Sequence, residues 1–111
     1  MHQDLWVKAA AFAVAGKTGV VVTADALIIP REVGDLARRQ LAEARGLSRE
    51  AVYFSATHTH ASLGGWEKAS SPKRLRRIRA GVRQWFARQL TTAAVAAVDD
   101  LAPASLDHGR F

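Results

Sequence analysis

Two short apolar stretches near the start of the chain have the character of β-strands. The first runs from Val7 to Val14 with Lys8 as its one polar residue, and the second, from Val20 to Ala24, is almost continuously apolar and rich in valine. Residues 16–19 are Gly-Lys-Thr-Gly, which suits a turn and predicts an antiparallel pair. Because continuous apolar character is typical of a strand buried on both faces, we expect the second strand to be central in its sheet.

The next pattern is that of a helix followed by a third strand. Pro30 suits the first turn of a helix, and Gly46 suits a left-handed stop. Between them, apolar residues recur at spacings of three and four: Val33, Leu36, Ala37, Leu41 and Ala44. Residues 51–55 return to strand character. A helical connection of this length predicts a parallel strand pair joined by a right-handed crossover.

A long helix is predicted after a loop at 56–71. Ser71 and Pro72 provide a cap and a first-turn proline, and apolar residues continue at helical spacing to about Asp100, with an irregularity expected at Gly81. We expect Trp85 with Phe86 on this helix, and Trp6 on the first strand, to lie in the core. Residues 104–111, after Pro103, resemble the beginning of a further strand.

The predicted fold class is therefore α/β. We expect a mixed sheet with an antiparallel first strand pair, a right-handed strand-helix-strand crossover, and a long C-terminal helix followed by a strand. The 111 residues correspond to one domain, and zero cysteines exclude disulfides, thiolate metal sites and a cysteine nucleophile. The sequence has no signal peptide pattern and no run of about 20 apolar residues, so we expect a soluble chain.

The net charge of +6 is unevenly distributed. Between residues 68 and 88 there is no acidic residue, and half of the 16 Lys and Arg lie there: Lys68, Lys73, Arg74, Arg76, Arg77, Arg79, Arg83 and Arg88. A solvated helix face is the preferred interpretation. An anionic lipid surface is a possible partner, and nucleic acid is the weaker alternative because no aromatic residue interleaves with these arginines before Trp85.

Two histidines, His58 and His60, follow the third predicted strand. The carboxyl end of such a strand is where ligands bind in open α/β sheets. If the segment is extended, residues two apart point to the same side, so both imidazoles could reach one metal ion. Hydroxyls of Ser55, Thr57, Thr59 and Ser62 could fix the imidazole tautomers, and Gly64 and Gly65 would allow close approach of a substrate. A solvated polar loop is the alternative.

This histidine segment resembles that of a known enzyme family. Thr57-His58-Thr59-His60, preceded by residues 52–56 and followed by Ser62 and Gly64-Gly65, is similar to the Thr-His-Thr-His signature of the neutral/alkaline, non-lysosomal ceramidases. Residues 2–9, His-Gln-Asp-Leu-Trp-Val-Lys-Ala, resemble that family's His-Asp-Pro-Leu-Tyr-Ala-Lys-Ala segment, and Thr23-Ala24-Asp25 resembles its next strand end. The resemblance extends in order over almost the whole chain.

The resemblance implies a zinc-dependent amide hydrolase. It makes His58 a ligand of one catalytic Zn²⁺ and His60 the residue that stabilises the oxyanion. The implied substrate is ceramide, whose N-acyl amide bond a zinc-activated water hydrolyses to sphingosine and a fatty acid. Further candidates for substrate binding or for supporting the site are Asp25, Thr57, Thr59, Gly64, Gly65, Trp66, His2 and Asp4. Members of the family are often secreted or membrane-associated.

The chain also departs from the family pattern. Ala61 and Leu63 stand where the family has Ser and Pro, and the family's other zinc ligands, a second His, a Glu and a Tyr, belong to segments beyond this chain. His108 and Asp107 match none of them. On the resemblance, residues 1–111 are a single partial domain with an incomplete ligand set, and we expect weak catalysis or none from it alone. A non-catalytic α/β module that binds anionic partners through the basic helix 73–88 remains the alternative.

Overall fold

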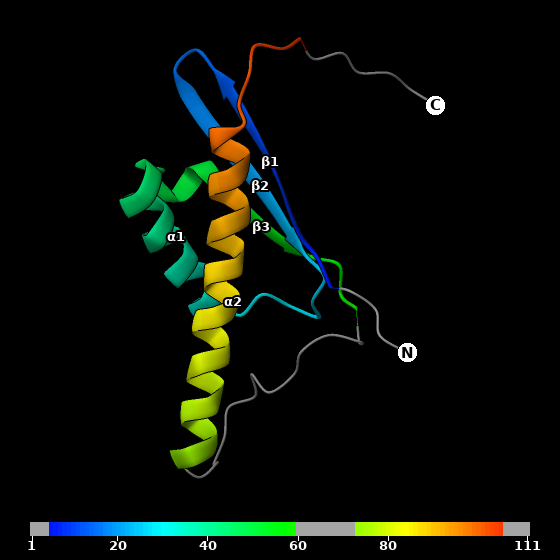
Figure 1. Cartoon of the computed structure of the whole chain (residues 1–111), viewed down its shortest axis with the longest axis vertical. Helices are drawn as coiled ribbons and strands as arrows, with labels where there is room; N and C mark the ends of the chain where they lie inside the picture. Colours follow the sequence, from blue (N-terminus) through cyan, green and yellow to red (C-terminus); the bar gives the residue numbers. More distant parts are fainter. Residues whose placement is uncertain (1–4, 60–72, 106–111) are drawn as a thin grey trace.

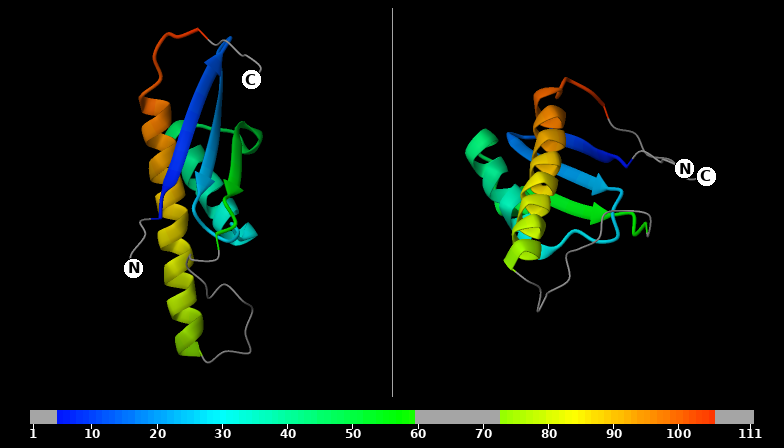
Figure 2. Two further views of the ribbon diagram at one scale, coloured as in Figure 1. Left: turned by 90° about the vertical axis from the view of Figure 1, so that its right-hand side faces the viewer. Right: turned by 60° about the horizontal axis from the view of Figure 1, so that its bottom comes forward.

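A computed structural model describes residues 5–59 and 73–105 of the chain. The elements follow in the order β1 (Val7–Val14), β2 (Lys17–Ala24), α1 (Arg31–Arg45), the short 3-10 turn η1 (Arg49–Ala51), β3 (Val52–Ala56) and α2 (Lys73–Asp99). The three strands form one mixed sheet in the order β1-β2-β3, and both helices pack on the same face of it (Figures 1 and 2). The predicted α/β class and mixed sheet are confirmed.

β1 and β2 form a tight hairpin. Val14 is paired with Lys17, so the loop consists of Ala15 and Gly16, whose φ angles are 52° and 79°. Positive φ at both central residues is the requirement of the turn that matches the twist of a two-residue hairpin. The antiparallel pairing was predicted correctly. The predicted turn at 16–19 was too long, because Lys17, Thr18 and Gly19 already belong to β2 and pair with β1.

The crossover from β2 to β3 runs through α1, and the strands pair in parallel with Val20 opposite Val52 and Ala24 opposite Ala56. α1 begins at Arg31, one residue later than predicted, because Pro30 has extended backbone and lies just before the first turn. At its end Gly46 has a φ of 65°, and its N–H donates to the Ala42 carbonyl at 3.0 Å. The N–H of Leu47 reaches the Leu41 carbonyl at 3.5 Å, which completes the common glycine-terminated helix stop.

β2 is the central strand, as predicted, but it is buried on one face and not on both. Val20, Val22 and Ala24 are at most 2% exposed, whereas Val21 between them is 41% exposed. The helices cover the face to which Val20 and Val22 point, and the described residues include nothing that covers the other. The core lies between sheet and helices and consists mainly of small aliphatic residues: Val20, Val22, Ala24, Ala26, Val33, Ala37, Leu41, Leu47, Val52, Phe86, Ala87, Leu90 and Ala94.

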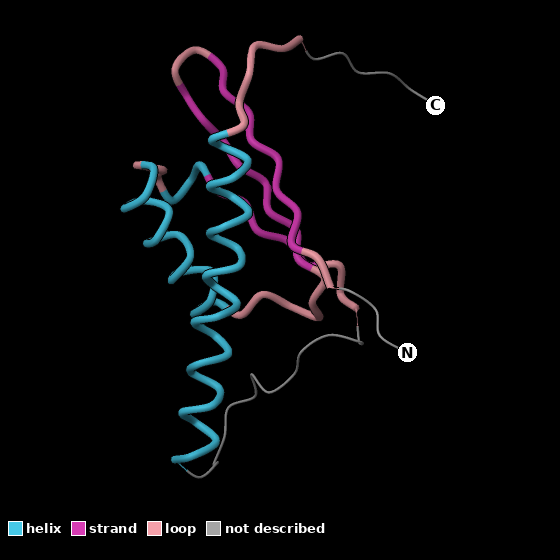
Figure 3. Tube along the Cα trace, in the orientation of Figure 1, coloured by secondary structure: helices cyan, strands magenta, loops and turns pink. Residues whose placement is uncertain are grey.

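α2 is one continuous helix, so the irregularity expected at Gly81 is absent from it. Its second half packs on the sheet and on α1, and its first half extends past the carboxyl end of β2 and β3 (Figures 1 and 3). Residues 101–105 have no regular secondary structure, and the remainder of the strand expected at 104–111 lies outside the described residues. Within the described part, no helix has both the length and the apolar character of a membrane span.

Two of the residues expected in the core lie at the surface. Trp85 is 47% exposed and Trp6 is 58% exposed, whereas Phe86 is buried as predicted. The apolar stripe of α2 that reaches the sheet contains Phe86, Leu90 and Ala94, and Trp85 lies beside this stripe rather than on it. Trp6 precedes β1 at the end of the sheet, where the core stops.

Candidate functional site

The candidate site lies where three chain segments meet at one end of the sheet. β2 and β3 end there, and β1 begins there because it is antiparallel to β2 (Figure 3). Backbone hydrogen bonds continue beyond the strands: Asp25 N–H donates to the Trp6 carbonyl at 2.8 Å, and Thr57 N–H donates to the Ala24 carbonyl at 3.0 Å. The residues after the strand ends are therefore held by the sheet itself.

The carboxylate of Asp25 joins all three segments. Its Oδ2 accepts the backbone N–H of Trp6 at 3.1 Å, and its Oδ1 accepts the hydroxyl of Thr57 at 3.2 Å. A charged acceptor makes stronger hydrogen bonds than a neutral one. Asp25 is thus both a negative charge at the site and the group that ties the start of β1 to the residue before His58.

His58 is held in a definite orientation by two neighbouring carbonyls. Its backbone N–H donates to Ala26 at 2.9 Å, and its Nδ1 lies 2.9 Å from the carbonyl oxygen of Leu27. A carbonyl oxygen only accepts, so Nδ1 carries the proton, and in the neutral imidazole the lone pair is on Nε2. This is the arrangement in which proteins commonly present a histidine to a metal ion.

The backbone at His58 is in the left-handed region, with a φ of 63°. A residue with a Cβ reaches this region at a cost and stays there only when the surroundings impose it. The prediction of an extended segment from His58 to His60 is therefore wrong at His58, and simple alternation does not place the two imidazoles on one side. β3 ends at Ala56, two residues earlier.

The structure brings together three of the predicted site residues, namely Asp25, Thr57 and His58. Thr59 follows them and is half-buried. The hydroxyls predicted to orient imidazoles have other partners in two cases, because Thr57 binds Asp25 and Ser55 binds the Thr23 hydroxyl at 2.8 Å. The remaining predicted site residues lie outside the described part of the chain: His2, Asp4, His60, Gly64, Gly65 and Trp66.

The described residues supply too few ligands for a complete zinc site. Nowhere in 5–59 and 73–105 do three or more His, Cys, Asp or Glu side chains gather closely enough to hold a metal ion. His58 fits the role of one zinc ligand by the proton position on its ring. Asp25 has both carboxylate oxygens in hydrogen bonds within the chain, which suits a supporting role better than direct ligation.

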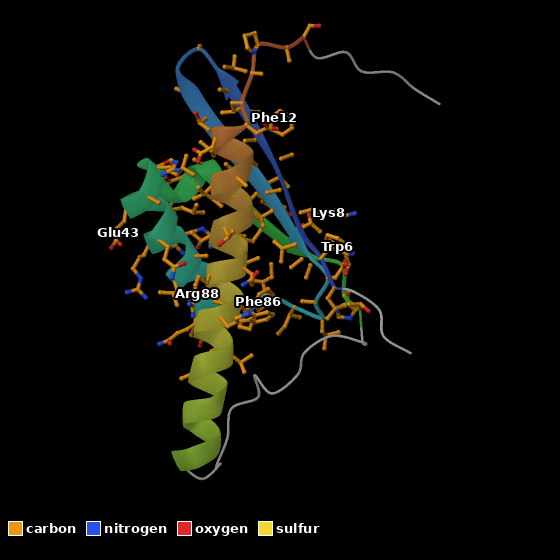
Figure 4. All side chains as sticks on the ribbon, viewed as in Figure 1. Trp6, Lys8, Phe12, Glu43, Phe86 and Arg88 are labelled. Carbon is orange, nitrogen blue, oxygen red and sulfur yellow. The ribbon has the colours of Figure 1, made fainter. Side chains whose placement is uncertain are left out.

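Sequence reasoning missed two features of this end of the sheet. The first is the Leu27 carbonyl, which binds the ring of His58. Every residue has a backbone carbonyl, so the residue type at position 27 does not indicate this contact. The second is a cavity of about 380 Å³ beside Asp25, between the strand ends and the middle of α2. Trp6 and Phe86 lie on its two sides (Figure 4). The unexpected exposure of two tryptophans is connected to this cavity, because Trp6 and Trp85 both line it.

The basic segment is described only in part. Arg83 is half-buried and Arg88 is exposed, and Lys68 and the side chains at 73–79 lie outside the described residues.

Comparison of the chain with protein-family models, with curated proteins and with solved structures finds no match.

Proposed function

We propose that this chain is part of a zinc-dependent amide hydrolase similar to the neutral ceramidases, in which His58 is a zinc ligand. The observation that carries the proposal is the hydrogen bond from Nδ1 of His58 to the Leu27 carbonyl, which leaves the lone pair of the neutral ring on Nε2, the atom that would bind the metal. The strained backbone at the same residue supports it, because such conformations are concentrated at functional sites. The resemblance of residues 57–60 to the ceramidase signature supplies the identity of the metal and of the substrate.

The site residues of this chain have distinct parts in the proposal. His58 would bind Zn²⁺ through Nε2, and Asp25 would hold Thr57, and with it the start of the histidine segment, in position. His60 would donate a hydrogen bond to the oxyanion that forms at the amide carbonyl. When bound, zinc supplies a water of lowered pKa and a polarised carbonyl. The further His, Glu and Tyr ligands would come from segments that the family has and this chain does not match.

Zinc binding is the first test of the proposal. The chain should bind Zn²⁺ weakly in calorimetric titration, and His58→Ala should lower the affinity by at least about tenfold. His108→Ala is the matched control, because it removes a histidine to which the resemblance assigns no role, and it should leave the affinity unchanged. Equal zinc affinity in all three proteins would contradict His58 as a ligand.

The second test is activity in a chain extended by the coding sequence on both sides. We expect zinc-dependent hydrolysis of an N-acylsphingosine, lost in His58→Ala and strongly reduced in His60→Ala. If the extended chain neither holds zinc nor cleaves the amide, the proposal is wrong. Binding of anionic vesicles or nucleic acid that weakens steeply with salt would then favour the alternative, a binding module that uses its basic helix.

A further inference from the structure

The cavity beside Asp25 is a pocket with walls from two separate parts of the chain. One wall comes from residues 5–7 and 24–26 at the end of the sheet, and the other from one face of α2 between Trp85 and Ala96. Its volume of about 380 Å³ lies in the range of small-molecule sites. The lining is mainly apolar, so a ligand would gain from the removal of its own apolar surface from water.

Both walls of the pocket present an exposed tryptophan. Trp6 is 58% exposed on the sheet side, and Trp85 is 47% exposed on the helix side. Phe86, which is 5% exposed, adds a third aromatic ring to the same lining. Large aromatic side chains are normally drawn into a core, and here the core contains Phe86 but leaves the two indoles accessible. Indole rings attract cations over their faces, more strongly than Tyr or Phe.

The one ionisable side chain among the described residues of the lining is a carboxylate, Asp25. This is notable in a chain whose net charge is +6. The carboxylate is fixed in place, since it accepts hydrogen bonds from Trp6 N–H at 3.1 Å and from the Thr57 hydroxyl at 3.2 Å. Its charge is therefore held in one position at the end of the pocket.

We propose that this pocket binds small organic cations, specifically ammonium ions that carry aliphatic substituents. The substituents fit the apolar lining, the positive charge is attracted to the indole rings of Trp6 and Trp85, and Asp25 supplies the opposite charge. Carboxylic acids would be repelled by Asp25, and neutral molecules of the same shape would lose the charge-dependent part of the binding. The proposal does not depend on a metal at His58.

The test compares three probes that share one alkyl chain. In calorimetric titration of the 111-residue chain without metal, hexyltrimethylammonium should bind about tenfold more tightly than hexanol, and hexanoate should bind least. Asp25→Asn keeps the shape and can still pair with Trp6 N–H and the Thr57 hydroxyl, but it removes the charge. We expect it to weaken binding of the ammonium probe about tenfold and to leave hexanol within about twofold. Asp100→Asn makes the same charge change outside the pocket and should alter neither.

A second pair of variants tests the location. Ala93→Phe fills the pocket from α2 and should abolish binding of both the ammonium probe and hexanol, and Trp85→Leu should remove the preference for the ammonium ion while retaining hexanol. Circular dichroism establishes whether each variant is folded. If Ala93→Phe does not fold, Trp85→Leu alone provides the test of the location. Equal affinity for the three probes, no binding of the ammonium probe, or binding unaffected by both variants would each overturn the proposal. Failure of the zinc test at His58 would leave this proposal standing, because the probes are titrated without metal.

Discussion

Two residues other than glycine have a positive φ in the described part of the chain, and different contacts hold each of them in this unfavourable backbone conformation. Ala15 lies in the hairpin turn with a φ of 52°, and His58 follows β3 with a φ of 63°. His58 is held by hydrogen bonds from its backbone and its ring to the carbonyls of Ala26 and Leu27. Ala15 adopts the turn conformation because the pairing of Val14 with Lys17 leaves room for two residues.

The turn gives a direct test of this cost. Replacement Ala15→Asn should stabilise the protein by about 0.5–1 kcal/mol, because Asn-Gly is the preferred pair where both central residues have positive φ. Urea unfolding measures the change. Ala13→Asn, on the neighbouring exposed strand position, is the control and should not stabilise the protein. An equal or lower unfolding midpoint for Ala15→Asn would show that the strand pairing, and not the turn, determines the hairpin.

The sequence correctly indicated some residues of the candidate site, but it did not indicate the hydrogen bonds that connect them. The pattern of strand and histidines correctly predicted that His58 follows a strand end, and Asp25 was placed at the neighbouring strand end. The left-handed backbone of His58 and its contact with Leu27 could not be predicted, because they depend on a backbone carbonyl 31 positions away. The hydrogen bonds of Asp25 likewise join segments 19 and 32 residues distant.

At the scale of elements, the two helices are joined at one end by an ion pair. Nε and one terminal nitrogen of Arg45, the last residue of α1, donate to the two carboxylate oxygens of Asp99 at 2.8 and 2.6 Å. Asp99 is the last residue of α2. The hydrogen bond to Asp99 raises the pKa of Arg45, and the hydrogen bond to Arg45 lowers the pKa of Asp99. A two-point contact of this kind also fixes the relative direction of the helix ends.

The lowered pKa of Asp99 predicts a stability effect with a definite pH range. A carboxyl group that is more acidic in the folded state stabilises the fold above its ordinary pKa of about 3.9, and that contribution is lost as the pH falls through the lower folded value. Asp99→Asn should therefore be less stable than the parent at pH 7, and the difference should disappear at pH values well below the ordinary pKa.

Urea unfolding at several pH values measures this difference, with Asp100→Asn as the control beside it. The pair is solvent-exposed, so added salt should reduce the effect at pH 7. A difference between Asp99→Asn and the parent that persists unchanged in strong acid would mean that the substitution acts through something other than the ion pair.

In the whole fold, the order of the elements and the pairing of the strands could be predicted from the sequence. Which faces of the sheet are covered could not. The apolar runs, the turn residues between them, Pro30 and Gly46 correctly predicted the antiparallel pair, the crossover helix and the parallel third strand. The continuous run of valines in β2 suggested burial on both faces, yet Val21 is 41% exposed. Valine is favoured in strands by its branched shape as well as by burial, so the residue type does not distinguish the two faces. The same holds for Trp6 and Trp85, whose apolar character predicted core positions, although both lie at the surface.

Neighbouring valines on β2 provide the sharpest test of this one-sided packing. Val22 is fully buried beneath the helices, and Val21 faces the open side of the sheet. Val22→Ala should cost about 2–3 kcal/mol of unfolding free energy, because it removes buried methyl groups and leaves a cavity, whereas Val21→Ala should cost less than about 1 kcal/mol. The two variants make the same chemical change in the same strand, so strand preference contributes equally to both. Comparable losses in urea unfolding would mean that another layer covers Val21, and a loss that grows with protein concentration would identify that layer as a second copy of the chain.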